Sequence, residues 1–193
     1  MNKGRLEAFS DGVLAIIITI MVLELKVPHG SDLAALNPIL PSFLTYILSF
    51  IYVGIYWNNH HHLLHTTRHV NGKILWTNLH LLFWLSLVPF VTGWMGENHF
   101  APLPTAVYGV VMLFAALAYE LLQSSIIKHH GSDHILASAV GKDWKGKVSL
   151  ALYITAIPVA FANRWIAVLF YIIVAGIWLI PDRRIESRIR EQK

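Results

Sequence analysis

The segment RLEAFSDGVLAIIITIMVLELKVP, residues 5–28, decides the class of fold. It has a short polar beginning that ends at Asp11, followed by an apolar run that continues to Leu23. The run is long enough for a helix that crosses a hydrocarbon core of about 30 Å. Ser10 and Asp11 fall just inside this helix, where polar groups are costly to bury, so they are candidates for a functional role. The segment therefore predicts a membrane-spanning first helix that carries function.

The composition of the whole chain also indicates a membrane protein. The 193 residues are 55% hydrophobic and only 13% charged, whereas a soluble domain has about 25% charged residues. There is no cysteine, which excludes disulfides, thiolate metal sites and thiol nucleophiles. No small-residue cleavage site follows the first apolar run, which ends at Glu24 and Lys26. This run is therefore expected to stay in the protein as a span and not to be a signal peptide.

Apolar runs along the chain predict an all-α integral membrane protein with six transmembrane helices, forming one domain over residues 1–193. Proline and glycine punctuate the runs where helix ends are expected. The fifth run has only about 16 residues, so we interpret it as one half of a tight hairpin with the sixth. A charged tail, residues 182–193, follows the last run. The predicted spans are approximately 9–27, 39–59, 75–94, 104–127, 148–163 and 164–181.

The distribution of lysine and arginine predicts the orientation, because these residues gather in cytoplasmic loops. Alternate loops place 13 of them on one side and two on the other. Both termini are therefore expected in the cytoplasm, and this asymmetry explains the basic balance without a nucleic-acid partner. The cytoplasmic group is Lys3, Arg5, Arg68, Lys73, Lys128, Lys142, Lys145, Lys147, Arg183, Arg184, Arg188, Arg190 and Lys193, and the outer group is Lys26 and Arg164.

One face of the first helix is apolar apart from a single hydroxyl. At 100° per residue this face collects Gly12, Ile16, Thr19, Ile20 and Leu23. An apolar stripe of this kind is typical of any membrane helix that packs against a partner or against lipid. It would equally suit the wall of a pore, and periodicity alone leaves both interpretations open.

Ser10 and Asp11 point away from this face, and polar residues of the second and third spans lie at the same depth. These residues are Trp57, His60, Asn78 and His80. An indole N–H, an imidazole and a carboxamide can all hydrogen-bond to a hydroxyl or a carboxylate. The arrangement predicts a polar network that fixes the angle of the first helix, either as a purely structural clamp or as part of a gate.

Residues in and beside the first three predicted spans resemble the signature of the transmembrane protein 175 family. Its members are potassium channels of animal endosomes and lysosomes, with single-repeat homologues in bacteria. The main motif is Arg5-x-x-x-Phe9-Ser10-Asp11, followed by the branched apolar helix. The similarity continues in Trp57-x-x-His60-His61 and in Asn78, Pro89-Phe90 and Thr92. It covers the first half of the chain well, and the second half only through the number and length of spans. The chain departs from the pattern at Asn71, where an aspartate is expected.

The resemblance implies a potassium-selective ion channel, favouring potassium over sodium, in which the first helix of each subunit lines the pore. The sequence contains no TVGYG segment, so a carbonyl filter of that type is absent. Carried onto this chain, the family's main hydrophobic constriction falls at Ile16, with Ile20 and Leu23 continuing it and Thr19 offering a ring of hydroxyls. A single six-span repeat then requires four copies, a homotetramer, in the cell membrane of a prokaryote. Potassium is the permeant ion, and no cofactor or metal is expected.

The eleven histidines leave an alternative of a different class. Clustered histidines at a membrane surface can hold the metal of a di-iron enzyme. The expected cytoplasmic histidines are His60, His61, His62, His65, His69, His129, His130 and His134. They form only two clusters, and neighbours in the HHH run face about 100° apart on a helix, so we expect no enzyme. A six-span metal-ion carrier would want carboxylates inside the spans, for which Glu24 and Glu120 are the candidates beyond Asp11.

Overall fold

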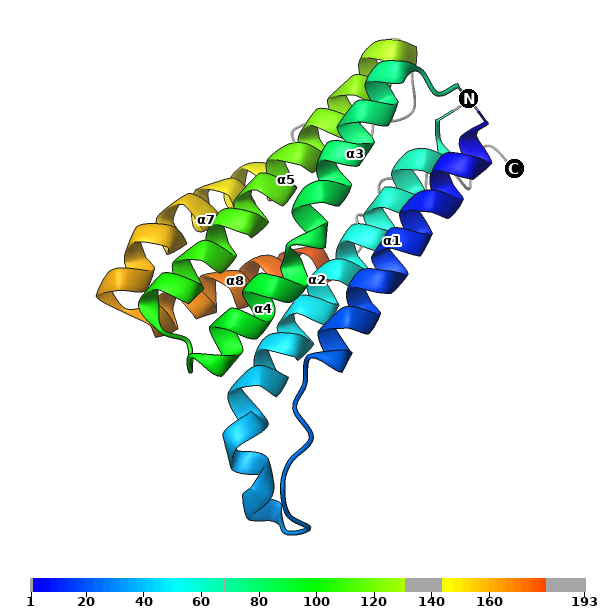
Figure 1. Cartoon of the computed structure of the whole chain (residues 1–193). Helices are drawn as coiled ribbons and strands as arrows, with labels where there is room; N and C mark the ends of the chain where they lie inside the picture. Colours follow the sequence, from blue (N-terminus) through cyan, green and yellow to red (C-terminus); the bar gives the residue numbers. More distant parts are fainter. Residues whose placement is uncertain (1, 68, 131–143, 180–193) are drawn as a thin grey trace.

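The computed structural model describes residues 2–67, 69–130 and 144–179, and all regular structure in these ranges is helical (Figure 1). The helices are α1 (Lys3–Leu23), η1 (Leu33–Ile39), α2 (Leu40–His65), α3 (Gly72–Ser86), α4 (Val88–Glu97), α5 (Pro102–His130), α7 (Trp144–Ala162) and α8 (Arg164–Leu179). Five helical stretches are long and apolar enough to cross a membrane, and α8, with 16 residues, is a shorter apolar helix. The predicted all-α membrane fold is confirmed.

Some predicted features lie outside the described residues. They are the last two residues of the span 164–181, the tail 182–193, Arg68, His134 and Lys142.

The first helix is displaced toward the N-terminus relative to the predicted span 9–27. It begins at Lys3 because the side chain of Asn2 accepts a hydrogen bond from the Gly4 amide at 3.0 Å and so caps the first turn. It ends at Leu23, with no basic residue in its last turn. The polar beginning of the chain is therefore helical, and Ser10 lies about two turns inside the helix.

The predicted third span, 75–94, is two helices that meet at Leu87. Pro89 occupies the first turn of α4, where its missing amide cannot bond to the preceding turn and its ring displaces a carbonyl. The break lets α4 lean against α2 while α3 packs against α5. Glycine allows the close approach of α4, because a Cβ added at Gly96 would lie 2.6 Å from the Cα of Ser42 on α2.

The subunit is a helical bundle in which α1 lies at one side and α7 at the other (Figure 1). The α1 helix contacts α2, α3 and α4, while α5 contacts α3, α4 and α7. The α7–α8 hairpin, predicted from the two shortest runs, is present, and α8 returns to contact α2. Since only one side of α1 is covered by the subunit, its other side is free to meet another molecule.

Candidate functional site

The first helix divides cleanly into a covered face and an exposed face. Its covered face consists of Leu6, Ser10, Leu14, Ile17 and Met21, all buried against the bundle. The face singled out from the sequence lies opposite and is exposed on the single subunit. Exposed fractions are 60% for Ile16, 41% for Ile20 and 76% for Leu23, and Gly12 and Thr19 are also exposed. We call Gly12, Ile16, Thr19, Ile20 and Leu23 the exposed stripe.

The hydroxyl of the exposed stripe has a partner within its own helix. Thr19 Oγ1 donates to the carbonyl of Ala15 at 2.9 Å, as threonines in membrane helices often do. This bond uses the only hydrogen of the hydroxyl, so the oxygen lone pairs are left to accept from other groups. Thr19 therefore presents an acceptor, and not a donor, on the exposed stripe.

The structure brings Ser10, Asn78 and His60 together in a buried network that joins three helices. Asn78 Nδ2 donates to Ser10 Oγ at 3.0 Å, and Asn78 Oδ1 lies 2.7 Å from His60 Nε2. Ser10 Oγ in turn donates to the carbonyl of Leu6 at 2.9 Å. All three polar side chains are buried, and each has a hydrogen-bonding partner, as a low-dielectric interior requires. The predicted contacts of Ser10, His60 and Asn78 are present.

Asp11 also reaches its predicted partner, but at the surface of the subunit. Trp57 Nε1 donates to Asp11 Oδ1 at 3.0 Å, and the Trp57 ring stacks on His61 with centroids 6.2 Å apart. Asp11 is exposed and Trp57 is 47% exposed. The cost of burial inferred from the sequence therefore applies to Ser10, which is buried within the subunit, and not to Asp11, which is exposed on it.

The remaining signature residues do not join this network. Arg5 and Phe9 are exposed on α1, on the same open side of the subunit as Asp11. His80, at the predicted depth, is exposed and meets the edge of the Trp84 ring instead.

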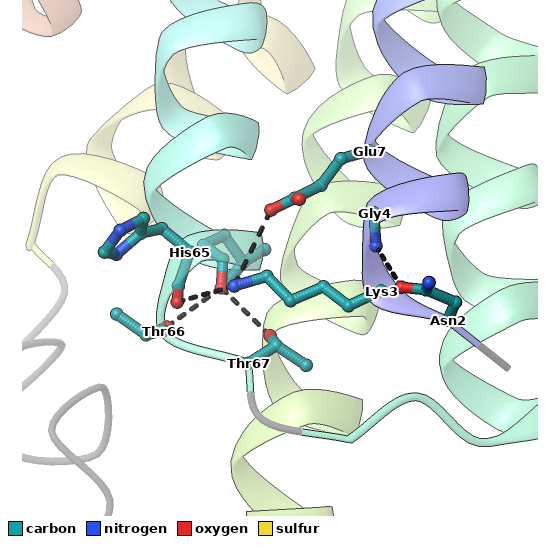
Figure 2. Close-up of polar contacts among 8 residues, drawn as sticks. Asn2, Lys3, Gly4, Glu7, His65, Thr66 and Thr67 are labelled. Atoms are coloured by element: carbon teal, nitrogen blue, oxygen red, sulfur yellow. Dashed lines mark hydrogen bonds and ion pairs between the residues drawn. The ribbon is translucent and has the colours of Figure 1, made fainter.

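Lys3, for which the sequence pattern predicts no contact, ties the N-terminal end of α1 to the C-terminal end of α2 (Figure 2). Lys3 Nζ donates to the carbonyl of His65 at 2.9 Å and lies 3.7 Å from Glu7 Oε1, one turn further along α1. Lys3 thus occupies one of the carbonyls that a helix leaves without an amide partner at its C-terminus. In the sequence, Lys3 is one of the basic residues that predict the membrane orientation, and nothing in the pattern points to His65 as its partner.

A second buried network, also missed, lies deeper in the bundle. Thr92 Oγ1 donates to Ser49 Oγ at 2.7 Å, and Ser49 Oγ lies 3.1 Å from the hydroxyl of Tyr108. These side chains join α4, α2 and α5 and are all buried. The signal that could have found it is the spacing of Thr45, Ser49 and Tyr52 along one face of an otherwise apolar run.

The C-terminal end of α1 borders an open cavity of about 380 Å³, lined in part by Glu24, Tyr46, Phe90 and Glu97. Lys26 lies 2.6 Å from Glu97 in an ion pair at this end. The Glu24 carboxylate lies over Gly93, where a Cβ would come within 3.1 Å of its oxygen. The carboxylates of Glu24 and Glu97 therefore both lie near the C-terminal end of the exposed stripe.

The histidines do not form a metal centre in the ranges that the structure describes. No group of three or more histidine, aspartate or glutamate side chains is placed to hold a metal ion there.

The position of Asn71 explains why an asparagine can replace the aspartate that the family pattern has there. Its side chain caps α3 by accepting from the Ile74 amide at 2.9 Å, a role that either residue fills, and its amide nitrogen lies 3.0 Å from His129 Nδ1.

Known proteins match this arrangement at the level of both sequence and fold. A sequence model described as endosomal/lysosomal potassium channel TMEM175 matches residues 5–89. A protein of Chryseobacterium sp. named as a potassium channel is 59% identical over 191 residues, covering 99% of this chain and 100% of its own length. The chain belongs to the TMEM175 family.

Solved and more distant TMEM175 relatives agree with this assignment. A crystal structure of a TMEM175 homologue from Chamaesiphon minutus, described as a lysosomal potassium-selective channel homologue, superposes with a TM-score of 0.77 at 29% identity. The match covers 93% of this chain and 97% of that one. The human protein, named an endosomal/lysosomal proton channel, is 40% identical over 96 residues, which is 43% of this chain and 19% of the human one.

Membership of the TMEM175 family settles the broad class of function. This TMEM175 protein is a multi-pass membrane protein and an ion channel, and it is not an enzyme. The di-iron interpretation of its histidines is therefore not favoured.

Proposed function

We propose that four copies of this chain form a potassium channel that favours potassium over sodium, with the exposed stripe of each α1 facing a central axis. The observation that carries the proposal is the division of α1. One face is buried against its own subunit, while Ile16, Ile20 and Leu23 remain exposed on the other. A single subunit leaves this face open, so a closed ring of identical helices needs a symmetric assembly.

Ile16 forms the narrowest ring in this proposal, with Ile20 and Leu23 continuing the apolar path. A dry apolar ring denies passing ions their hydration and conducts only when it is widened or wetted. The sequence has no TVGYG segment, so selectivity must come from the ring itself and from weak oxygen ligands such as Thr19. Potassium loses its water shell more readily than the smaller sodium ion, which gives a modest preference without a carbonyl filter.

The relatives support both the ion and the compartment. Proteins of Chryseobacterium, Streptomyces collinus and Chamaesiphon minutus that match this chain are each named potassium channels. All three organisms are bacteria, so the proposed location of this chain is the plasma membrane of a prokaryote with both termini in the cytoplasm. The permeant ion is the only ligand the proposal requires.

The decisive experiment measures ion flux from the purified protein in liposomes under a potassium gradient, with no metal added. Ile16→Asn should raise basal flux and bring the sodium-to-potassium permeability ratio closer to one, since a polar ring holds water at the constriction. Ile154→Asn is the matched control, because Ile154 is 58% exposed on α7, which lies on the opposite side of the bundle from α1 (Figure 1). Permeability ratios and flux unchanged in Ile16→Asn would remove Ile16 from the constriction, and absence of potassium flux in the unmodified protein would refute the proposed function.

A further inference from the structure

A long apolar groove runs between α2 and α8, on a part of the subunit that does not involve α1. Its volume is about 1010 Å³, at the upper end of the range of roughly 300–1,000 Å³ for small-molecule pockets. Its walls include Leu44 and Ile47 of α2 and Leu169 and Ile172 of α8, all exposed on the subunit. The two helices are in contact, and Figure 1 shows α8 behind α2 and α4.

The polar residues of the groove gather at one end. Arg164 and His99 line it where α8 begins and the α4–α5 turn passes, and Trp165 beside them is also exposed. The Arg164 guanidinium carbon lies 5.4 Å from the centroid of the Trp165 ring. The groove is thus shaped like an amphiphile, with a cationic end and an apolar body, and tryptophan with arginine is typical of the level of lipid headgroups.

Arg164 has no ion-pair partner in the part of the chain that the structure describes. The sequence places only Lys26 and Arg164 on one side of the membrane, and Lys26 is paired with Glu97 at 2.6 Å. Within the described ranges, Arg164 makes a ring contact but no ion pair. A guanidinium with free donors matches the oxygens of a phosphate, which it can bind through two parallel hydrogen bonds.

The turn that delivers His99 adopts an unusual conformation to do so. His99 and Phe100 both have positive φ, at 51° and 58°, in the left-handed region that non-glycine residues seldom occupy. Phe100 is buried and its ring lies 5.3 Å from that of Trp165. This packing holds His99 at the cationic end of the groove, with Nδ1 donating to the Glu97 carbonyl at 3.2 Å. Nε2 donates to a phosphate oxygen when the ring is doubly protonated.

We propose that this groove binds one anionic phospholipid, with its phosphate at Arg164 and His99 and its acyl chains along α2 and α8. The lipid comes from the leaflet in which Arg164 lies. Charge complementarity favours a lipid over a second copy of the chain, since the apolar body of the groove ends at an unpaired cation. The lipid would fill the space that the short α8 leaves beside α2.

The test counts lipids on the purified, delipidated protein by native mass spectrometry during titration with phosphatidylglycerol or with diacylglycerol of the same chains. We expect one phosphatidylglycerol per subunit and weaker binding of diacylglycerol. Arg164→Gln should weaken phosphatidylglycerol binding at least about tenfold, as expected for a lost charge-assisted contact. Lys26→Gln, the same charge change on the same side, should leave binding unchanged.

A groove-filling variant tests the apolar body independently. A Cβ added at Gly176, which lines the groove, would meet nothing within 4 Å, so Gly176→Phe should fold and exclude the acyl chains. Equal affinity for the two lipids, or binding unaffected in both Arg164→Gln and Gly176→Phe, would overturn the proposal. A change of oligomer mass in Gly176→Phe would also overturn it, because it would assign the groove to contact between copies of the chain.

Discussion

Asn78 holds the first helix through a single carboxamide. It offers its amide to Ser10 on α1 and its carbonyl oxygen to His60 on α2, so one side chain of α3 fixes the relation of both helices. Because lipid supplies no competing hydrogen bonds and little hydrophobic drive between helices, such contacts and close packing are what orient a membrane helix.

Asn78→Ala should therefore destabilise the subunit. The change leaves the His60 ring nitrogen and one side of Ser10 without partners in a buried site, at a cost of about 1–3 kcal/mol. Thermal unfolding of the purified protein in detergent measures the loss. Asn98→Ala is the control, since the exposed side chain of Asn98, the residue directly after α4, donates to the carbonyl of Trp94 in that same helix. Equal stability of the two variants would mean that the network does not hold α1.

Thr19 has a close counterpart elsewhere in the chain, which allows a controlled test of its role. Thr155 on α7 is also exposed and also donates to an alanine carbonyl one turn back, that of Ala151 at 2.7 Å. Thr19→Val keeps the shape but removes the oxygen, so it should lower potassium preference with little loss of flux, while Thr155→Val should change neither. An unchanged sodium-to-potassium permeability ratio in Thr19→Val would leave Thr19 as a helix residue only.

Among the elements, the α3–α4 break was not predicted, although the residue that causes it was quoted in the family motif. Pro89 sits inside a run whose hydropathy is continuous, and the sequence does not say whether neighbours will compensate a proline in a membrane helix. Pro158 gives the contrast, because it lies within α7 without ending that helix. A proline within an apolar run can therefore either end the helix or lie inside it, and the apolar sequence around it does not distinguish the two cases.

The close contact of α4 with α2 should depend on Gly96. Gly96→Ala would place a methyl group against the backbone at Ser42, and overpacking of this kind costs about 1–3 kcal/mol. Gly54→Ala on α2 is the matched control, because a Cβ there meets nothing within 4 Å and alanine favours a helix by about 1 kcal/mol over glycine. The midpoint of thermal unfolding should fall in the first variant and hold or rise in the second. A midpoint for Gly96→Ala at or above that of the unmodified protein would show that α4 can move away from α2.

At the scale of the whole molecule, the exposed stripe of α1 is the feature on which the proposed assembly depends. The sequence predicted which residues form this face, because helical periodicity fixes direction around an axis. It could not predict that Asp11 and Trp57 meet at the surface of the subunit, since the depth of a residue along a helix does not say whether its side is covered by other helices. The Thr92–Ser49–Tyr108 network was missed for a related reason: it joins three helices whose mutual rotation no local pattern specifies.

The proposed assembly makes a direct prediction of mass. Light scattering of the purified protein, corrected for detergent, should give a protein mass near four times the 21.8 kDa of one chain. One repeat contributes one α1 helix to the proposed pore, so several copies must close it, and the family resemblance implies that their number is four. A stable monomer or dimer that still conducts potassium in liposomes would contradict the central placement of α1.

The way α1 ends has an electrostatic consequence for such a ring. A helix carries about half a negative charge at its C-terminus, and α1 reaches Leu23 without a basic residue in its last turn and is followed directly by Glu24. Four copies would aim four negative dipole ends at the outer mouth, with the four Glu24 carboxylates near it beside Gly93. Such a mouth gathers cations from dilute solution and turns anions away before either meets the narrow apolar path. The entrance would then select cations over anions. The isoleucine ring would need only to discriminate between one alkali cation and another.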